Sequence, residues 1–218
     1  MSDQRIPTDV DLFKLPQWLP EPENDGAADH LLGIELPHVR LRSTSGTLVD
    51  IAEVTARPCV LYFYPATVKP GIPIPGEWSE IPGARGCTLQ SCGYRDEHAA
   101  FRSVGCRVFG ISSQGQDPEQ GLEEQVEFAA RVRLPFELLN DSRFEMANAL
   151  RLPTFVARLR SPTVRFEGSD HQFPLQGRTL YKRLTLVADR GRVEKVFYPV
   201  FPPDRDAAFV LDYLRGRL

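Results

Sequence analysis

The stretch Gly86-Cys87-Thr88-Leu89-Gln90-Ser91-Cys92-Gly93-Tyr94-Arg95-Asp96 lies between two strand-like segments of the chain. The first segment, residues 59–64, is a short and almost continuous apolar run, and residues 107–112 form a similar run. Between them, residues 89–104 have the length of a helix and are followed by Gly105, a typical helix stop. A strand, a helix and a second strand in this order predict a βαβ unit with two parallel strands.

The rest of the chain adds antiparallel strands and further helices. From His38, apolar Val39 and Leu41 alternate with Arg40 and Arg42. A Ser-Thr-Ser-Gly turn and residues 47–49 follow, which together predict a β-hairpin. A second antiparallel hairpin is expected from residues 183–187 and 193–197. The remaining expected elements are a helix from Asp117 to Arg131, a strand at residues 136–139, a short helix capped at Ser142 and running toward Leu150, and a terminal amphipathic helix from Asp204 to Arg215. Together these elements predict an α/β fold with a mixed central sheet flanked by helices.

Three segments lie outside this regular pattern. Residues 1–30 are rich in Pro, Asp and Glu and have few periodic apolar positions, so we expect an N-terminal arm on the surface, followed by one domain over residues 31–218. Residues 66–82 form a Pro/Gly-rich loop, and residues 154–179 are irregular and charged. Both are expected to be loop insertions in the domain.

Composition limits the classes of function. The formal net charge of −3 and the content of 25% charged residues offer no basic face for nucleic acid or acidic lipid. The N-terminus lacks the apolar stretch of a secretory signal, and no segment is apolar enough to cross a bilayer, so a cytoplasmic location is expected. We expect no metal and no cofactor, because the spacing from Cys87 to Cys92 is wider than a zinc knuckle and no compact Cys/His pair completes a tetrahedral site.

Cys87 stands where a loop becomes a helix. The unpaired N–H groups of a first helical turn stabilise a thiolate, which is the reactive form of cysteine. Cys92, five residues further on, could capture the product of oxidation of Cys87. Cys59 and Cys106 lie at or near predicted strands and are expected to be inert core residues. A redox function is therefore predicted.

Several segments together resemble the peroxiredoxins of the bacterioferritin comigratory (Q-type) subgroup within the AhpC/TSA family. They are Tyr64-Pro65, Pro82-Gly83, Gly86-Cys87-Thr88-Leu89-Gln90-Ser91-Cys92, Gly93-Tyr94-Arg95-Asp96 and Arg183-Leu184-Thr185-Leu186-Val187. The resemblance implies a thioredoxin-like fold in which Cys87 attacks a hydroperoxide and becomes a sulfenic acid. It further implies that Cys92 resolves this acid to an intramolecular disulfide, which thioredoxin or a similar dithiol then reduces.

The reactivity of Cys87 requires more than a helix terminus. An ordinary thiol is only a few per cent thiolate at pH 7, and making it largely anionic needs roughly 3.4 kcal/mol of preferential stabilisation. A helix N-terminus supplies up to about 2 kcal/mol, so a cation must contribute. The resemblance implies Arg183, and Arg85 is a local rival. His98 is excluded, because eleven residues of helix would place it about 16 Å away.

The two cysteines are poorly placed for a disulfide on an intact helix. They would lie about 140° apart around the helix axis and about 7.5 Å apart along it. A disulfide requires Cα atoms within about 6.8 Å. We therefore predict that the first one or two turns of this helix unwind on oxidation, with Gly86 and Gly93 easing the change.

One position departs from the pattern of the family. The family normally has Thr or Ser three residues before the reactive cysteine, where its hydroxyl orients the peroxide, and this chain has Ala84 there. Thr67 or Thr88 could supply the hydroxyl through the longer loop, and Thr67 is preferred.

Two other functions remain open from the sequence. A thioredoxin-like oxidoreductase would exchange disulfides with proteins, but such enzymes use Cys-x-x-Cys. A non-catalytic redox sensor on the same fold would be compatible with the missing threonine at Ala84. The expected partners are a peroxide and a dithiol reductant, and the chain is expected to be a monomer or a dimer.

Overall fold

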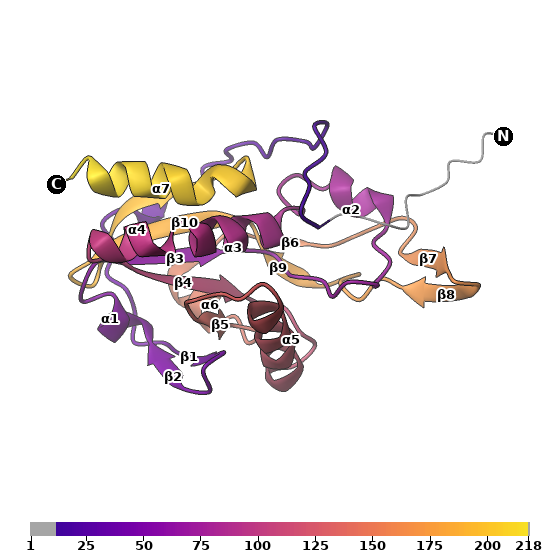
Figure 1. Cartoon of the computed structure of the whole chain (residues 1–218), viewed down its shortest axis with the longest axis horizontal. Helices are drawn as coiled ribbons and strands as arrows, with labels where there is room; N and C mark the ends of the chain where they lie inside the picture. The colour runs from indigo at the N-terminus through magenta and orange to yellow at the C-terminus, as the bar shows by residue number, and fades with distance from the viewer. Residues whose placement is uncertain (1–11, 218) are drawn as a thin grey trace.

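A seven-stranded mixed sheet organises the computed structural model, which describes residues 12–217 (Figure 1). The strand order is β11-β10-β3-β4-β5-β1-β2, in which β3, β4 and β5 are parallel and the other pairs are antiparallel. The strands are β1 (Arg40–Ser43), β2 (Leu48–Asp50), β3 (Cys59–Phe63), β4 (Arg107–Ser112), β5 (Leu138–Asn140), β10 (Leu184–Asp189) and β11 (Arg192–Phe197). The predicted α/β fold with a mixed central sheet, its βαβ unit and both hairpins are confirmed.

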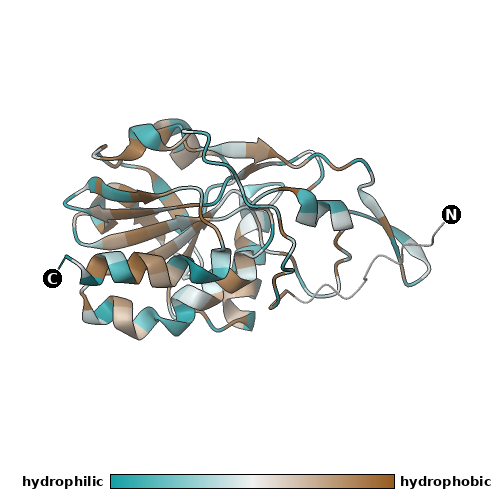
Figure 2. Ribbon diagram, turned by 90° about the horizontal axis from the view of Figure 1, so that it is seen from above, coloured by the Kyte–Doolittle hydropathy of each residue, from teal (hydrophilic) through white to brown (hydrophobic). Residues whose placement is uncertain are grey.

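Helices cover both faces of this sheet. The helices are α1 (Ile51–Val54), α2 (Gly76–Glu80), α3 (Cys87–Asp96), α4 (His98–Ser103), α5 (Pro118–Arg131), α6 (Glu145–Leu150) and α7 (Asp206–Arg215), with 3-10 turns at η1 (Asp29–Leu31) and η2 (Pro203–Arg205). Buried side chains of α3, α4, α5 and α7 form one apolar cluster with the sheet, and those of α1 and α6 form a second cluster on the other face. All five residues of β3 are buried. Figure 2 shows that the strands of the sheet are largely hydrophobic.

The caps of two helices show how local sequence sets their starts. Asp117 caps α5, because its side chain accepts a hydrogen bond from the N–H of Gln120 at 2.9 Å and Pro118 occupies the first turn. The cap predicted at Ser142 for α6 is wrong. The carboxylate of Asp141 accepts the N–H groups of Glu145, Met146 and Ala147 instead, because it carries two acceptor oxygens at the open end of the helix.

The helix predicted at residues 89–104 is two helices in the structure. It begins earlier, at Cys87, and is interrupted at Glu97, whose ψ of 4° departs from helical geometry before α4 begins. Gly86 precedes it with φ of 99°, and a Cβ built there would lie 2.3 Å from Cγ of Pro203. The conformation and the close approach of η2 both require glycine at position 86.

The two insertions pack against each other beside the sheet. In the second insertion β6 (Thr154–Val156) pairs with β9 (Thr179–Tyr181), and β7 (Thr163–Phe166) pairs with β8 (Ser169–Gln172) in a hairpin that projects from the body (Figure 1). Trp78 of the first insertion lies 5.3 Å from the ring of Phe173 in the second. These residues form a third apolar cluster, which also includes Leu12 of the N-terminal arm.

The N-terminal arm joins this arrangement, and its residues 1–11 lie outside the described range. Asp25 pairs with Lys182 at 2.5 Å and accepts a hydrogen bond from the hydroxyl of Tyr198 at 2.7 Å. Ala28 and Leu31 are buried in the main core, so the arm is attached to the domain at its end. The division of the chain at residue 30 stays a prediction.

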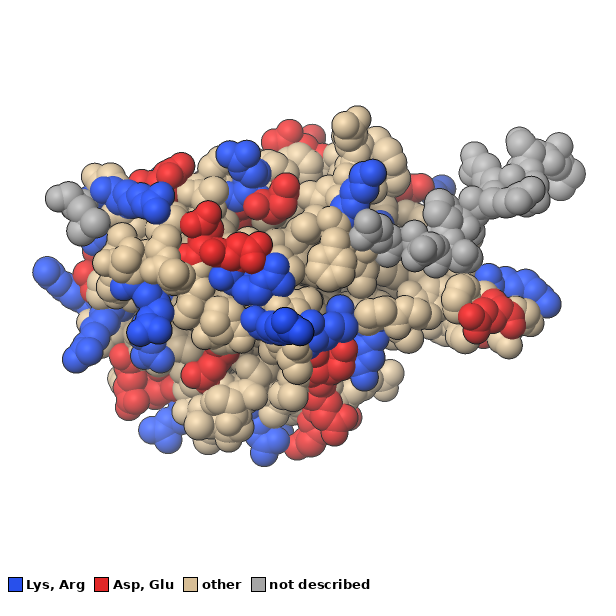
Figure 3. All heavy atoms as spheres, in the orientation of Figure 1, with Lys and Arg blue, Asp and Glu red and all other residues tan. Residues whose placement is uncertain are grey.

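Positive and negative side chains are interspersed on the face of the molecule shown in Figure 3. Within residues 12–217, no helix is long and apolar enough to span a membrane. Over the same range, no three His, Cys, Asp or Glu side chains are grouped closely enough to hold a metal ion.

Candidate active site

Cys87 is the first residue of α3 and is only 5% exposed. Strand β3 leads toward this point, and the loop after it returns the chain to the start of the helix, where Gly86 makes the turn. The thiol lies 3.8 Å from the carbonyl oxygen of Ala84, as a donor. Cys87 therefore lies at a helix N-terminus and is buried.

Arg183 brings a positive charge to the sulfur of Cys87. Its Nη2 donates to Sγ of Cys87 at 3.3 Å and also contacts the carbonyl oxygens of Gly83 at 3.2 Å and Arg85 at 3.0 Å. Arg183 immediately precedes β10, which pairs with β3 through Leu184 and Phe63. Two adjacent strands thus place the guanidinium beside the start of α3. It is 2% exposed, so its charge is little screened by water.

From the sequence, Arg85 was a second candidate for the cation beside Cys87. In the structure its side chain contacts a different residue. Nη1 of Arg85 donates to Oγ of Ser79 at 3.1 Å, within the first insertion. The guanidinium in contact with Sγ of Cys87 is that of Arg183. His98 begins α4, beyond the end of α3, and packs 5.9 Å from the ring of Phe136.

A buried polar network fixes Arg183, and the sequence analysis did not predict it. Nη1 of Arg183 donates to Oε1 of Gln90, and Nε2 of Gln90 donates to Asp206 at 2.7 Å. Asp206 also accepts the hydroxyl groups of Tyr94 at 2.9 Å and Thr185 at 2.8 Å. Burial raises the pKa of Asp206, and these three donors oppose the rise. The network joins α3, α7 and β10 around the guanidinium.

The position of Gln90 carries a weak signal in the sequence. It lies three residues after Cys87, and residues at this spacing share a helix face. The polar side chain of Gln90 is therefore expected on the same face of the helix as the sulfur of Cys87. Asp206 carried no such signal, because an acidic residue in the first turn of a helix is common on a protein surface.

Cys92 is buried on α3, five residues after Cys87. It is 6% exposed and belongs to the apolar cluster beneath α3, α4 and α7. Burial raises the pKa of the Cys92 thiol, with Arg95 opposing. Both cysteines are free thiols, so the structure represents the reduced protein.

Thr67 and Thr88 both line the small cavity that reaches Cys87. Thr67 is held from two sides, because its N–H and its hydroxyl both donate to Oε1 of Gln114, at 3.0 and 3.1 Å. A hydroxyl whose proton is engaged in this way keeps its oxygen lone pairs for another donor. The structure brings together Cys87, Arg183 and Thr67, the residues expected for one site, with Cys92 inside the helix that carries Cys87.

Cys59 and Cys106 are buried at the far ends of their strands. Burial raises the pKa of Cys106 to about 12 and raises the pKa of Cys59 further. Both thiols donate to backbone carbonyls, of Val60 and Arg107 respectively. Their surroundings keep both thiols protonated at neutral pH.

Comparison with known proteins gives a consistent result. Residues 81–191, just over half of the chain, match the AhpC/TSA family, and this segment includes Cys87, Cys92 and Arg183. The chain is 28% identical over 211 residues to a chloroplastic peroxiredoxin Q of Gentiana triflora, covering 94% of this chain and 78% of that protein. It is 31% identical over 204 residues to the chloroplastic peroxiredoxin Q of Sedum lineare, covering 94% and 88%.

The fold is likewise shared with solved structures. The crystal structure of peroxidoxin BcpB from Mycobacterium tuberculosis aligns with a TM-score of 0.58 and 24% identity, over 85% of this chain and 96% of that chain. This likeness shows the thioredoxin-like fold. The extent of the family match and the identity to the Sedum lineare protein together establish that the chain belongs to the AhpC/TSA family and is a peroxiredoxin of the kind that includes peroxiredoxin Q.

Proposed function

We propose that this peroxiredoxin is a thiol-dependent peroxidase whose nucleophile is Cys87. The thiolate attacks the distal oxygen of hydrogen peroxide or an organic hydroperoxide, the O–O bond breaks, and the leaving oxygen takes a proton. The products are a sulfenic acid on Cys87 and water or an alcohol. The 3.3 Å contact between Nη2 of Arg183 and Sγ of Cys87 carries this proposal, since it puts a buried positive charge at the reacting sulfur.

Arg183 acts in this reaction as an electrostatic catalyst. As the O–O bond breaks, negative charge moves from the sulfur to the leaving oxygen. A guanidinium beside both atoms can stabilise the charge on either of them. The Nε of Arg183 is buried and has no hydrogen-bond partner among the described residues, so the guanidinium retains donor capacity. The remaining contacts to Gly83, Arg85 and Gln90 keep its position fixed before the peroxide arrives.

Thr67 supplies the hydroxyl that the family normally places three residues before the cysteine. Because its own proton goes to Gln114, its oxygen can accept the O–H of the peroxide and orient it toward Cys87. The hydroxyl of Thr88 lines the same cavity and is the alternative. Ala84 contributes only its carbonyl oxygen, to the thiol of Cys87.

Cys92 completes the cycle as the resolving cysteine. Its thiolate attacks the sulfenic sulfur of Cys87, hydroxide leaves and is protonated to water, and a Cys87–Cys92 disulfide forms. The burial of Cys92 under α3 supports the prediction that the start of this helix must unwind first. A dithiol such as thioredoxin then reduces the disulfide by exchange and is itself oxidised.

The reductant, the oligomeric state and the compartment are parts of the proposal. We propose a monomer or a dimer that is reduced by thioredoxin or a similar dithiol. The sequence predicts a cytoplasmic location, whereas the plant relatives are named as chloroplastic and a 28% identical relative, peroxiredoxin Bcp, comes from Bacillus subtilis. Fractionation of cells that produce the tagged protein would test the location.

Turnover with purified components tests the enzyme function. Hydrogen peroxide consumption should be coupled to oxidation of thioredoxin in the wild-type protein and should disappear in Cys87→Ser. Cys92→Ser should consume peroxide in a single turnover and then stop. Peroxide consumption by Cys87→Ser at the wild-type rate would defeat the assignment of the nucleophile.

A further inference from the structure

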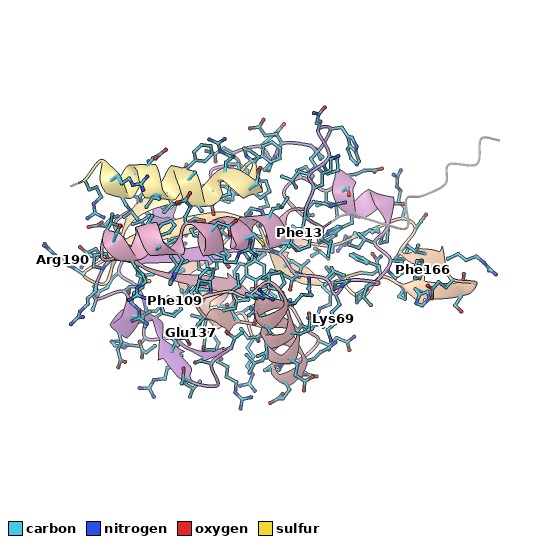
Figure 4. The ribbon with its side chains drawn as sticks, viewed as in Figure 1. Phe13, Lys69, Phe109, Glu137, Phe166 and Arg190 are labelled. Atoms are coloured by element: carbon cyan, nitrogen blue, oxygen red, sulfur yellow. The ribbon has the colours of Figure 1, made fainter. Side chains whose placement is uncertain are left out.

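The cavity that reaches Cys87 has a wall made by the N-terminal arm. Leu12 and Leu15 line this cavity together with Thr67, Trp78 and Cys87. A Cβ built on Gly86 would lie 3.2 Å from Cδ2 of Leu15, so the arm packs directly on the turn before Cys87. Figure 4 labels Phe13, between these two leucines, where the arm passes the start of α3.

The arm leaves little room beside the sulfur. The volume of the cavity is about 30 Å³. A site needs roughly 10 to 15 Å³ of such volume to hold one water molecule, so the space beside the sulfur matches a molecule of two heavy atoms, and the rest of the cavity opens to solvent. Hydrogen peroxide fits this description, whereas the aryl group of an aromatic hydroperoxide does not.

The N-terminal arm is anchored at two points, Leu12 and Asp25. Leu12 packs with the apolar cluster of the two insertions, which contains Trp78 and Phe173. On the other side, Asp25 is anchored by Lys182 and Tyr198. The hydrogen bond from Lys182 is the main cause that lowers the pKa of Asp25, so this carboxylate is charged at neutral pH. Both leucines are partly buried, so they are packed and not simply exposed on a loose segment.

We propose that Leu12 and Leu15 determine specificity by restricting the peroxide of this enzyme to small molecules. The arm lies outside residues 81–191, the segment that matches the family model. The proposal rests on the proposed peroxidase function, since it concerns access to the same sulfur. It predicts that the enzyme prefers hydrogen peroxide to bulky organic hydroperoxides. Removal of the leucine side chains should weaken this preference.

The test compares rates of Cys87 oxidation by hydrogen peroxide and by cumene hydroperoxide, measured by stopped flow. In the full-length chain, Leu15→Ala opens the cavity, Leu15→Met conserves its volume, and Trp18→Ala alters an exposed residue of the same arm. We expect the ratio of the cumene hydroperoxide rate to the hydrogen peroxide rate to rise at least about fivefold in Leu15→Ala. It should stay within about twofold of wild type in the other two variants.

The outcomes separate this inference from the proposed function. An unchanged ratio in Leu15→Ala and in Leu12→Ala, with wild-type hydrogen peroxide rates, would overturn the inference and leave the peroxidase function standing. Absence of oxidation of the wild-type protein by either peroxide would overturn the function itself. Circular dichroism of each variant verifies that the fold is kept, and a rise in the ratio in Trp18→Ala equal to that in Leu15→Ala would also contradict the inference.

Discussion

Nη2 of Arg183 lies 3.3 Å from Sγ of Cys87, although 96 positions separate the two residues in the chain. The pairing of β10 with β3 brings them together, since Arg183 directly precedes β10 and the loop after β3 returns to Cys87. A contact made by the central sheet is rigid, and this rigidity suits a group that must be in place before the peroxide arrives.

Replacing Arg183 by Lys should keep the positive charge but lose most of the activity. An ammonium cannot contact Sγ of Cys87, Gln90 and the two backbone carbonyls at once, as the planar guanidinium does. Hydrogen bonds to charged groups contribute about 1.5 to 3 kcal/mol, so the rate constant for oxidation by hydrogen peroxide should fall by roughly 10- to 100-fold. Stopped-flow measurement of this rate gives the answer, and a rate within twofold of wild type would contradict the role of Arg183.

Gln90→Leu should lower the peroxide rate by about 10-fold, because it removes the acceptor that positions Arg183. Thr185→Val is a matched control, since it removes a different contact to Asp206 and leaves the Gln90–Arg183 contact in place. Both variants should lose thermal stability, but only Gln90→Leu should lose rate. Equal loss of rate in both would mean that the network acts through stability alone.

The buried carboxyl of Asp206 predicts a pH dependence of stability. Burial raises the pKa of Asp206 above its ordinary value of 3.8, so the folded state binds the proton more tightly than the unfolded chain does. The free energy of unfolding of the wild-type protein, relative to Asp206→Asn, should therefore fall as the pH rises from about 4 toward neutral. Urea unfolding of both proteins across this range measures the difference, and a difference that increases with pH would contradict the sign.

Disulfide formation should unwind the beginning of α3. Cys92 is buried on this helix and can reach Cys87 only if hydrogen bonds of its first turns break, including that from Gln90 N–H to Gly86 O. Amide hydrogen exchange over residues 86–96 should increase in the oxidised protein, whereas Cys92→Ser treated with the same peroxide should show less change. Identical exchange in the reduced and the disulfide forms of the wild-type protein would rule out unwinding.

The sequence predicted the central sheet well because its signals are local. Apolar runs at residues 59–64 and 107–112, and the glycine at position 105, encode the strands and the helix stop without information from elsewhere in the chain. The cap of α6 was assigned to the wrong residue because serine and aspartate are both good caps and are adjacent here. The terminal helix was expected to be amphipathic, and in α7 Leu211 is buried whereas Phe209 is 43% exposed.

The residues of the site could be predicted from the sequence only where they belong to a recognisable motif. Cys87 and Cys92 stand in a recognisable segment, and Arg183 followed from the resemblance to a family. The Gln90–Asp206 contact spans 116 positions and joins two helices, so no local pattern reveals it. The wall at Leu12 and Leu15 was missed for a similar reason, since two leucines in a Pro-rich arm have no periodicity that indicates burial.

The central claim is that Cys87 is the residue that reacts with peroxide, and trapping its sulfenic acid tests this most directly. In Cys92→Ser, an equimolar amount of hydrogen peroxide should leave a sulfenic acid on Cys87, which dimedone labels and peptide mass spectrometry locates. The account predicts the label on the peptide containing Cys87, with Cys59 and Cys106 unlabelled. A label on either of those two cysteines in place of Cys87 would contradict it.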